Sequence, residues 1–176
     1  MEIEAKILNI DPEKAIKNLT TIGAVKIFDG EINTLFYDTP EGTLSKRKDL
    51  LRLRRIGKEV ILTYKRYISN KNVKTREEYE TEVGSLEKMD LILRSLGYQI
   101  IEKMSKKRVS YKTESVRVDI DIHLENYSII PPLLEIEAKD EDAINKLVVE
   151  LGFSREDLSA WDFFEVARHY LAKTPK

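Results

Sequence analysis

Charged and apolar residues alternate along several short stretches of the chain, beginning at its first residues. In Met1-Glu2-Ile3-Glu4-Ala5-Lys6 the charged side chains occupy every second position and apolar side chains lie between them. Successive side chains of a β-strand point to opposite faces, so this stretch predicts a strand with one charged and one apolar face. The same alternation recurs in 51–54, 78–82, 106–109, 117–121 and 135–137.

Turn signals and apolar periodicity divide the rest of the chain into strands and helices. Gly57-Lys58 suits a tight hairpin, and Asp11-Pro12-Glu13 is typical of a helix start. Eight strands are predicted, at residues 1–6, 31–38, 50–56, 59–67, 74–83, 101–112, 114–123 and 132–139. Four helices are predicted: from Asp11 to Gly23, from Ser85 to about Gly97, from Asp140 to near Gly152, and from Ser159 to about Lys173.

This order of elements predicts an α+β fold built on an eight-stranded, mostly antiparallel, closed β-barrel. The pentapeptide Glu-Ile-Glu-Ala-Lys occurs at 2–6 and at 135–139, each time before a helix, which indicates two equivalent barrel walls. The helices need an apolar sheet surface to cover, and alternate positions such as Leu53 and Val118 provide one on the outside. The charged face would then line a tunnel, and a charged lumen is a binding site.

Length and charge narrow the class of partner. At 176 residues the chain is expected to form a single domain over 1–176. A formal net charge of −1 with 35% charged residues means that an anion-binding surface must be local. We therefore expect a small-molecule partner and no stable nucleic-acid partner; a homodimer is left open.

The side chains that could bind a metal restrict the kind of metal site that this chain can form. The chain has no cysteine, and its two histidines, His123 and His169, are far apart in the sequence. A metal would have to be bound by oxygen, which favours Mg²⁺ or Mn²⁺ over zinc. The first strand begins at the initiator methionine and no apolar run could span a bilayer, so a cytoplasmic protein without membrane contact is expected.

Phosphate would have to be held by side chains, because the sequence lacks a glycine-rich phosphate loop. Arg52 and Arg54 offer planar donor groups suited to phosphate oxygens. Further positive charge comes from Lys6, Lys65, Lys106 and Arg108. A triphosphate carries about four negative charges near neutral pH and needs several such cations.

In this order the motifs resemble the CYTH domain of the triphosphate tunnel metalloenzymes. The resemblance rests on Glu2-x-Glu4-x-Lys6, Phe36-Tyr37-Asp38-Thr39-Pro40, Leu51-Arg52-Leu53-Arg54, Thr63-Tyr64-Lys65, Lys106-Lys107-Arg108 and Glu135-Ile136-Glu137. That family includes class IV adenylate cyclases, thiamine triphosphatases, inorganic triphosphatases and RNA triphosphatases. The resemblance implies a closed tunnel that binds a triphosphate end-on together with a divalent metal.

The resemblance also implies roles for individual residues. The metal-associated acids would be Glu2, Glu4, Asp121, Glu135 and Glu137, with Asp119 as second choice to Asp121. The residues that bind the triphosphate would be Lys6, Arg52, Arg54, Lys65, Lys106 and Arg108. The catalytic candidates are Glu4, Lys6 and Glu80, with Lys6 either orienting water or balancing its carboxylate neighbours.

Two departures from the family pattern concern the choice between Asp119 and Asp121 as ligand and the tunnel rim after Lys65. A longer, proline-containing connection, 126–132, separates Asp121 from the last acidic strand, and Arg66-Tyr67 follows Lys65 where the family commonly has proline. The run Ser45-Lys46-Arg47-Lys48 is expected to form a solvated loop or a tunnel rim. The aromatic residues Trp161, Phe163 and Phe164 are expected in the core, and His123 in a structural or solvated position.

Three functions are consistent with these residues. The first is a metal-dependent hydrolase of inorganic triphosphate, nucleoside triphosphates or thiamine triphosphate. The second is a class IV-type adenylate cyclase, for which no adenine pocket is identifiable in the sequence. The third is a non-catalytic polyphosphate or nucleotide-binding protein, which would not need the acidic strands. The sequence leaves open the substrate, the number of metal ions and the choice between hydrolysis and cyclisation.

Overall fold

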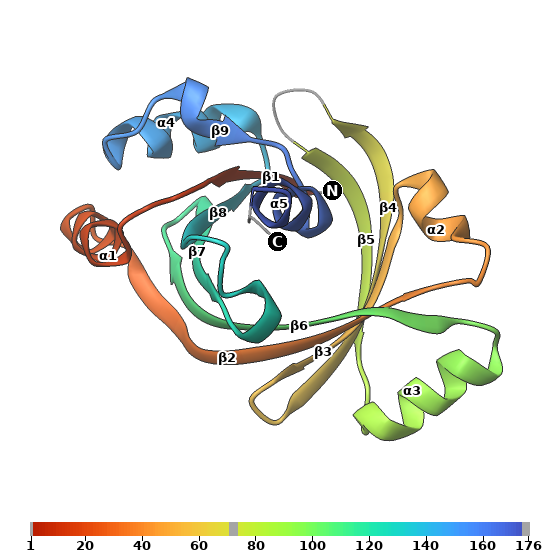
Figure 1. Ribbon diagram of the computed structural model, residues 1–176. Helices are drawn as coiled ribbons and strands as arrows, with labels where there is room; N and C mark the ends of the chain where they lie inside the picture. The colour runs from red at the N-terminus through yellow and green to blue at the C-terminus, as the bar shows by residue number, and fades with distance from the viewer. Residues whose placement is uncertain (1, 71–73, 174–176) are drawn as a thin grey trace.

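The computed structural model describes residues 2–70 and 74–173, apart from the side chains of residues 2, 69, 70, 74 and 75. In this part of the chain, a curled antiparallel sheet of nine strands dominates the fold (Figure 1). The strands are β1 (Glu2–Ile7), β2 (Val25–Asp38), β3 (Leu50–Ile56), β4 (Glu59–Asn70), β5 (Lys74–Glu82), β6 (Gln99–Lys112), β7 (Val116–His123), β8 (Leu133–Ala138) and β9 (Leu158–Ser159).

The sheet closes on itself as predicted. Its strand order is β5-β4-β3-β2-β6-β7-β8-β1-β9, and β1 also pairs with β5. In that closing contact Glu2, Ile3 and Glu4 lie opposite Arg76, Thr75 and Lys74. The two-residue strand β9 takes the remaining part of the same β1 edge, opposite Lys6 and Ile7. All eight predicted strands are present, and β9 is an addition that the sequence did not reveal.

The two copies of the pentapeptide are direct neighbours in the barrel. Strands β1 and β8 run antiparallel, with Glu4 opposite Glu137 and Lys6 opposite Glu135. This register places the charged side chains of both strands on one face and their apolar side chains on the other. The repeat therefore forms one continuous wall with acidic residues on its inner face.

Five α-helices accompany the sheet in the described ranges. They are α1 (Pro12–Thr21), α2 (Thr43–Arg47), α3 (Leu86–Ser95), α4 (Glu141–Glu150) and α5 (Phe163–Leu171). The Asp11 side chain accepts hydrogen bonds from the first backbone N–H groups of α1, and Ser85, Asp140 and Asp162 do the same for α3, α4 and α5. No helix in the described part is long and apolar enough to cross a membrane.

The apolar outer face of the barrel is covered by helices as predicted. One core joins α1 and α4 to the outer face of β1, β7 and β8, around Leu19, Ile136 and Ile144. A second core packs Leu93 of α3 against Leu53 of β3 on the opposite wall. Because Leu19, Leu53, Ile136 and Ile144 are fully buried, these outer contacts fix which face of each strand points into the lumen.

Helix α5 departs from the predicted outer arrangement. In Figure 1, α5 lies at one mouth of the barrel, within the ring of strands. Its residues Phe163 and Val166 pack against inward-facing Phe36, Met104 and Leu133. At this end the inner face of the strands is apolar, so burying an apolar helix there is favourable. The predicted start at Ser159 was also wrong: Ser159 belongs to β9, and Asp162 caps the helix.

Two further boundaries differ from the sequence prediction. Strand β2 begins at Val25 instead of residue 31, because the long strand β6 supplies pairing partners as far as Lys112. Residues 45–47 lie in the short helix α2, and Lys48 caps it with a left-handed backbone conformation, φ 61°. The basic run is therefore a helical turn and its cap, not a loop.

Candidate active site in the barrel lumen

The predicted charged residues converge inside the barrel. A cavity of about 490 Å³ occupies the end opposite α5, and a smaller one of about 60 Å³ lies between the charged residues and α5. The larger cavity is lined by Glu4, Arg52, Arg54, Lys65, Glu80, Arg108, Glu135 and Glu137. The smaller one adds Lys6, Lys106 and Asp121. The side chain of Glu2 lies outside the described residues, so its predicted position in the lumen is untested.

Acids and bases are segregated around the ring of strands. Strands β4, β3, β2 and β6 are neighbours in this order. Three of them, β4, β3 and β6, carry the cations Lys65, Arg52, Arg54, Lys106 and Arg108. The remaining arc, β7, β8, β1 and β5, carries the predicted acids, with Lys6 as the one cation of the predicted set among them. Among the predicted residues, the lumen therefore has a basic wall facing an acidic wall, as the homogeneous charge clusters of the sequence indicate.

A buried cluster joins the two walls at Arg108. Its guanidinium donates to Asp121, with Nε–Oδ1 and Nη2–Oδ2 distances of 2.6 Å, to Glu135 at 2.6 Å and to Asp119. The Lys106 ammonium donates to Asp121 Oδ2 at 2.6 Å. Burial raises the pKa of Asp121, but Arg108 and Lys106 outweigh it and lower the pKa to about 2. Burial and the charge of Arg108 lower the pKa of Lys106 to about 8.

Asp121 thus has both carboxylate oxygens engaged by cations. It is 1% exposed, and its partners are two of the predicted phosphate-binding residues. This geometry favours a role in which Asp121 positions Lys106 and Arg108. Its predicted role as a metal ligand stays a prediction.

A second network links β1, β8, β4 and β5. Lys6 donates to Glu135 at 3.1 Å and lies 3.8 Å from Glu4, while Lys65 contacts Glu78 at 2.7 Å and Glu4 at 3.8 Å. Burial lowers the pKa of Lys6, but the charges of Glu135 and Glu4 reverse this effect and raise it. The pKa of Glu4 is lowered, since Lys6 and Lys65 outweigh burial and the repulsion of Glu135. Burial is likewise outweighed at Glu135, whose pKa is lowered by Lys6 and Arg108, so Glu4 and Glu135 are ionised near neutral pH.

Arg54 differs from the other cations of the lumen. It forms no ion pair among the described side chains, and its Nε is buried without a hydrogen-bond partner. Burial and the repulsion of Arg52 and Arg108 lower its pKa. A guanidinium stays protonated in proteins, so this environment favours the arrival of an anion.

The acidic wall offers oxygen ligands but no preformed metal centre. Carboxylates suit Mg²⁺ and Mn²⁺, and Glu4, Glu135 and Glu137 lie on adjacent strands. Among the described residues, however, no three acidic or histidine side chains converge closely enough to hold a metal ion. Glu4 and Glu135 are turned toward lysine and arginine instead. The donor chemistry fits a hard divalent cation, provided that these carboxylates exchange their partners for it.

Two lumenal arginines were missed in the sequence. Arg76 on β5 is 6% exposed and lies 3.5 Å from Asp162 at the start of α5. Arg117 on β7 lines the larger cavity and donates to Asp119 at 3.1 Å. Both share the alternating parity of the acids on their own strands, and that parity could have identified them. His123 is buried against Phe163 of α5, with ring centroids 5.7 Å apart.

The open mouth of the larger cavity has an apolar rim. Phe28, Ile32, Ile56 and Ile61 line it beside the charged residues. The ring of Phe28 lies over Gly30, where an added Cβ would approach the ring to 3.1 Å. Glu59, Arg117 and Glu137 line the same cavity, so a molecule entering from this end would meet apolar and charged side chains together.

Comparisons with known proteins agree with this architecture. The CYTH domain family model matches residues 1–160. A Methanocaldococcus jannaschii protein named for a proposed adenylate cyclase activity is 28% identical over 121 residues, 69% of each chain.

Solved structures show the same fold. A conserved hypothetical protein from Pyrococcus furiosus has a TM-score of 0.79 and 25% identity, with coverage of 94% of this chain and 99% of the other. A Hippeastrum protein proposed as an adenylyl cyclase, and described with a dominant triphosphatase activity, has a TM-score of 0.71 and 19% identity over 96% of each chain. Together with the closed barrel and its charged lumen, the match to residues 1–160 shows that the chain belongs to the CYTH domain family.

Proposed function

We propose that the protein is a divalent-metal-dependent hydrolase of triphosphate-containing substrates. The observation that carries this proposal is Arg54: a lumenal guanidinium without a carboxylate partner, flanked by two further arginines. A terminal phosphate would supply the missing negative charge. CYTH enzymes depend on divalent metals in general, and the acidic wall opposite Arg54 suits Mg²⁺ or Mn²⁺.

The closed end of the barrel supports one direction of substrate binding. Helix α5 fills one mouth, so the triphosphate enters through the mouth lined by Phe28 and Ile56. Arg52, Arg54 and Lys65 would hold its oxygens from the basic wall, with Arg108 and Lys106 deeper in the lumen. Glu4, Glu135 and Glu137 would hold the metal, which when bound neutralises phosphate charge and polarises the phosphorus under attack.

Hydrolysis requires one water molecule and one proton acceptor. The water oxygen forms a bond to the terminal phosphorus, the bond to the bridging oxygen breaks, and the shorter phosphate chain leaves with that oxygen. Glu80 is the carboxylate we assign as proton acceptor, because it faces the cavity and has a hydroxyl partner, Thr63, at 3.0 Å. The arginines of the basic wall stabilise the charge that develops on the departing oxygen.

Adenylate cyclase activity is the second candidate. It is favoured by the name of the Methanocaldococcus jannaschii relative, and the apolar rim around Phe28 offers a surface for a nucleobase. Cyclisation would use the same triphosphate-binding residues, but the ribose 3′ hydroxyl would attack the α-phosphorus of ATP. The bond from that phosphorus to the bridging oxygen would break, which gives cyclic AMP and releases pyrophosphate. The dominant triphosphatase activity of the Hippeastrum protein favours hydrolysis for the present chain.

One assay separates these functions. Purified protein is incubated with Mg²⁺ or Mn²⁺ and, separately, tripolyphosphate, ATP, other nucleotides and thiamine triphosphate, and phosphate, pyrophosphate and cyclic AMP are resolved. We expect phosphate release from at least one triphosphate. Cyclic AMP with stoichiometric pyrophosphate would favour the cyclase. Tight tripolyphosphate binding without any turnover would refute both activities and leave a binding protein.

A further inference from the structure

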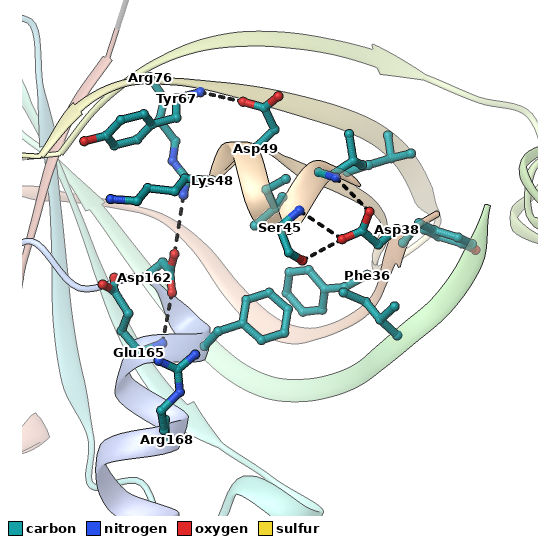
Figure 2. A pocket seen from close by; sticks show the side chains of 16 residues that line it. Phe36, Asp38, Ser45, Lys48, Asp49, Tyr67, Arg76, Asp162, Glu165 and Arg168 are labelled. Carbon is teal, nitrogen blue, oxygen red and sulfur yellow. Dashed lines mark hydrogen bonds and ion pairs between the residues drawn. The ribbon is translucent and has the colours of Figure 1, made fainter. Parts of the chain in front are cut away.

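The closed end of the lumen blocks a substrate from extending past α5. Asp162, at the start of α5, accepts from the Glu165 backbone N–H at 2.9 Å and lies 3.5 Å from Arg76 of β5 (Figure 2). Arg76 and Asp162 line both the smaller lumenal cavity and a separate groove of about 310 Å³ beyond them, so this pair separates the two spaces. Any group that a triphosphate carries must therefore lie at the opposite, open mouth.

At the open mouth, apolar side chains form an arc over three neighbouring strands. They are Ile27, Phe28 and Ile32 of β2, Ile56 of β3 and Ile61 of β4. Ile32 lies opposite Ile56 in the β2–β3 register, and Ile61 is a diagonal neighbour of Ile56 across β3 and β4. Arg117 and Glu137 line the same cavity from β7 and β8, in another part of the ring. The apolar residues therefore lie together on one side of the mouth.

A β-bulge directs two consecutive residues of β2 to this mouth. Lys26 pairs with Tyr111 of β6 and Phe28 pairs with Ser110, which leaves Ile27 between them without a partner on β6. Consecutive side chains of a regular strand point to opposite faces, yet Ile27 and Phe28 both line the cavity. Bulges commonly redirect side chains next to binding sites. Strand β2 thus departs from regular pairing where it adds apolar surface to the mouth.

Gly30 provides the space that the ring of Phe28 occupies. Gly30 follows Phe28 by two residues, so a side chain there would point to the same face of β2. A Cβ at this position would come within 3.1 Å of the ring. Without that atom the ring leans along β2 over Gly30 and stays half-buried at the mouth. The absence of a side chain at Gly30 therefore supports the placement of an aromatic ring at the mouth.

The apolar side chains of the mouth are accessible to a ligand. Ile27 is 49% exposed, and Phe28, Ile56 and Ile61 are half-buried. Covering them with an apolar group removes their surface from water, which is favourable, and an aromatic group adds stacking on the Phe28 ring. A purely anionic ligand would leave this surface uncovered. The mouth is therefore suited to a ligand that is anionic at one end and aromatic at the other.

We propose that the substrate is a triphosphate ester of a planar organic group, such as a nucleoside triphosphate, and that this group lies on Phe28 and Ile56. The inference rests on the end-on binding of a triphosphate in the proposed function. With the terminal phosphate at Arg54, the group at the other end of the phosphate chain lies at the mouth. The cavity volume of about 490 Å³ is in the range of sites for organic ligands. Inorganic triphosphate has no group to place on this surface, so the inference narrows the substrate class.

The test compares ATP with tripolyphosphate, because both contain three linked phosphates and only ATP carries a planar group. Each is titrated by calorimetry, in chelator, into the unsubstituted protein and its variants. We expect Phe28→Ala to weaken ATP binding about 5- to 30-fold, in the range for stacking on an aromatic side chain, and to leave tripolyphosphate binding within about twofold. Phe28→Leu keeps an apolar side chain without the ring and should lose part of the ATP affinity. Phe28→Tyr keeps the ring and should retain it.

Tyr79→Ala is the matched control, because Tyr79 is a 55% exposed aromatic residue of β5 that does not line the cavity. Both affinities should be unchanged in this variant, and near-ultraviolet circular dichroism verifies that every variant is native. Phe28→Trp locates the planar group. ATP should change the fluorescence of the added indole and tripolyphosphate should not, relative to the unsubstituted protein, whose Trp161 packs at the closed end.

Three results would overturn the inference. Equal weakening of ATP and tripolyphosphate by Phe28→Ala and Phe28→Leu would make Phe28 a structural residue of the lumen. Unchanged ATP affinity in these variants would show that the planar group does not reach Phe28, and absence of ATP binding by the unsubstituted protein would exclude the site.

The outcome is separable from that of the hydrolase, because binding in chelator requires no turnover. Phosphate release from tripolyphosphate together with unchanged ATP affinity in Phe28→Ala would refute only this inference. The expected loss of ATP affinity without turnover of any triphosphate would refute only the hydrolase.

Discussion

Arg54→Ala tests the central claim about the lumen, because this residue contributes charge without an ion pair. The substitution removes a guanidinium that faces the larger cavity and has no carboxylate partner among the described side chains. It also relieves the repulsion among Arg52, Arg54 and Arg108 that lowers the pKa of Arg54. Binding and stability should therefore respond differently.

The expected magnitudes follow from these contacts. Loss of one charge-assisted phosphate contact costs about 1.5–3 kcal/mol, or roughly 10- to 150-fold in affinity. The free energy of unfolding should stay within about 1 kcal/mol of the original value, or rise, because no ion pair is lost. Arg108→Ala makes the contrast, since it leaves buried Asp119 and Asp121 without their main partner and should cost about 3–5 kcal/mol of stability.

The assay is calorimetric titration of tripolyphosphate in chelator, beside urea unfolding of the same samples. Arg55→Ala is the matched control, because the adjacent residue lies on the outer face in an exposed ion pair with Glu87 at 2.9 Å. Its tripolyphosphate affinity should be unchanged. Unaltered affinity in Arg54→Ala, or a loss equal to that of Arg55→Ala, would refute the assignment of Arg54 to the phosphate.

Three further predictions concern the acidic wall and the closed end. Glu4→Gln should reduce turnover sharply while metal-free tripolyphosphate binding is kept or strengthened, since a repulsive charge has gone; normal turnover would make Glu4 structural. Phosphate release should require Mg²⁺ or Mn²⁺ and be inhibited by Ca²⁺, whose longer bonds misplace substrate and water; full activity in chelator would exclude the metal mechanism. Burial and Lys106 lower the pKa of His123 from 6.5 to about 4, so between pH 7 and pH 5 the unfolded state takes up a proton that the folded state does not. Acidification from pH 7 to pH 5 should therefore lower the free energy of unfolding, measured with urea, by about 2 kcal/mol, and His123→Phe should not show this loss. An identical pH dependence in the variant would show that His123 is not the group responsible.

The sequence predicted the barrel because the alternation of charge and apolar residues is a local property of each strand. Period two determines which face of β1, β3 and β8 is inside, and the outer cores around Leu53 and Ile136 confirm the assignment. The lumenal set followed from the same parity, so Glu4, Arg52, Arg54 and Glu137 meet around one cavity as predicted.

The closed end of the barrel was missed although a signal for it exists. On three strands the inward position two residues from a charged one is apolar: Leu50 before Arg52, Met104 before Lys106 and Leu133 before Glu135. The change from charged to apolar at the same parity marks the depth at which α5 packs. Whether a helix or a ligand covers such a surface depends on the path of the chain after Ser159, which alternation within strands does not specify.

The pairing of the charges could not be predicted either, because it depends on register between distant strands. Asp121 sits beside Lys106 and Arg108 only through the β6–β7 register, and Lys6 beside Glu135 only through the β1–β8 register. The sequence specifies which residues are charged, whereas the register between paired strands determines which of these charges neutralise one another. This is why Asp121 had the features of a metal ligand in the sequence but the geometry of a positioning residue in the fold.

These pairings constrain how the lumen can work. Ion pairs among Glu4, Glu135, Lys6 and Lys65 keep buried charges neutralised when no substrate is present, which limits the cost of a charged interior. A triphosphate that takes up the cations frees these carboxylates, and a divalent cation that takes up the carboxylates frees the lysines. Each ligand thus removes the side chains that compete with the other ligand for its binding partners. Tripolyphosphate should therefore bind more tightly in Mg²⁺ than in chelator. Tripolyphosphate should in turn tighten Mg²⁺ binding by the same factor. Glu4→Gln should reduce this coupling, whereas Arg55→Ala should preserve it; independent binding of the two ligands in the unsubstituted protein would show that the ion pairs of the lumen are not exchanged on binding.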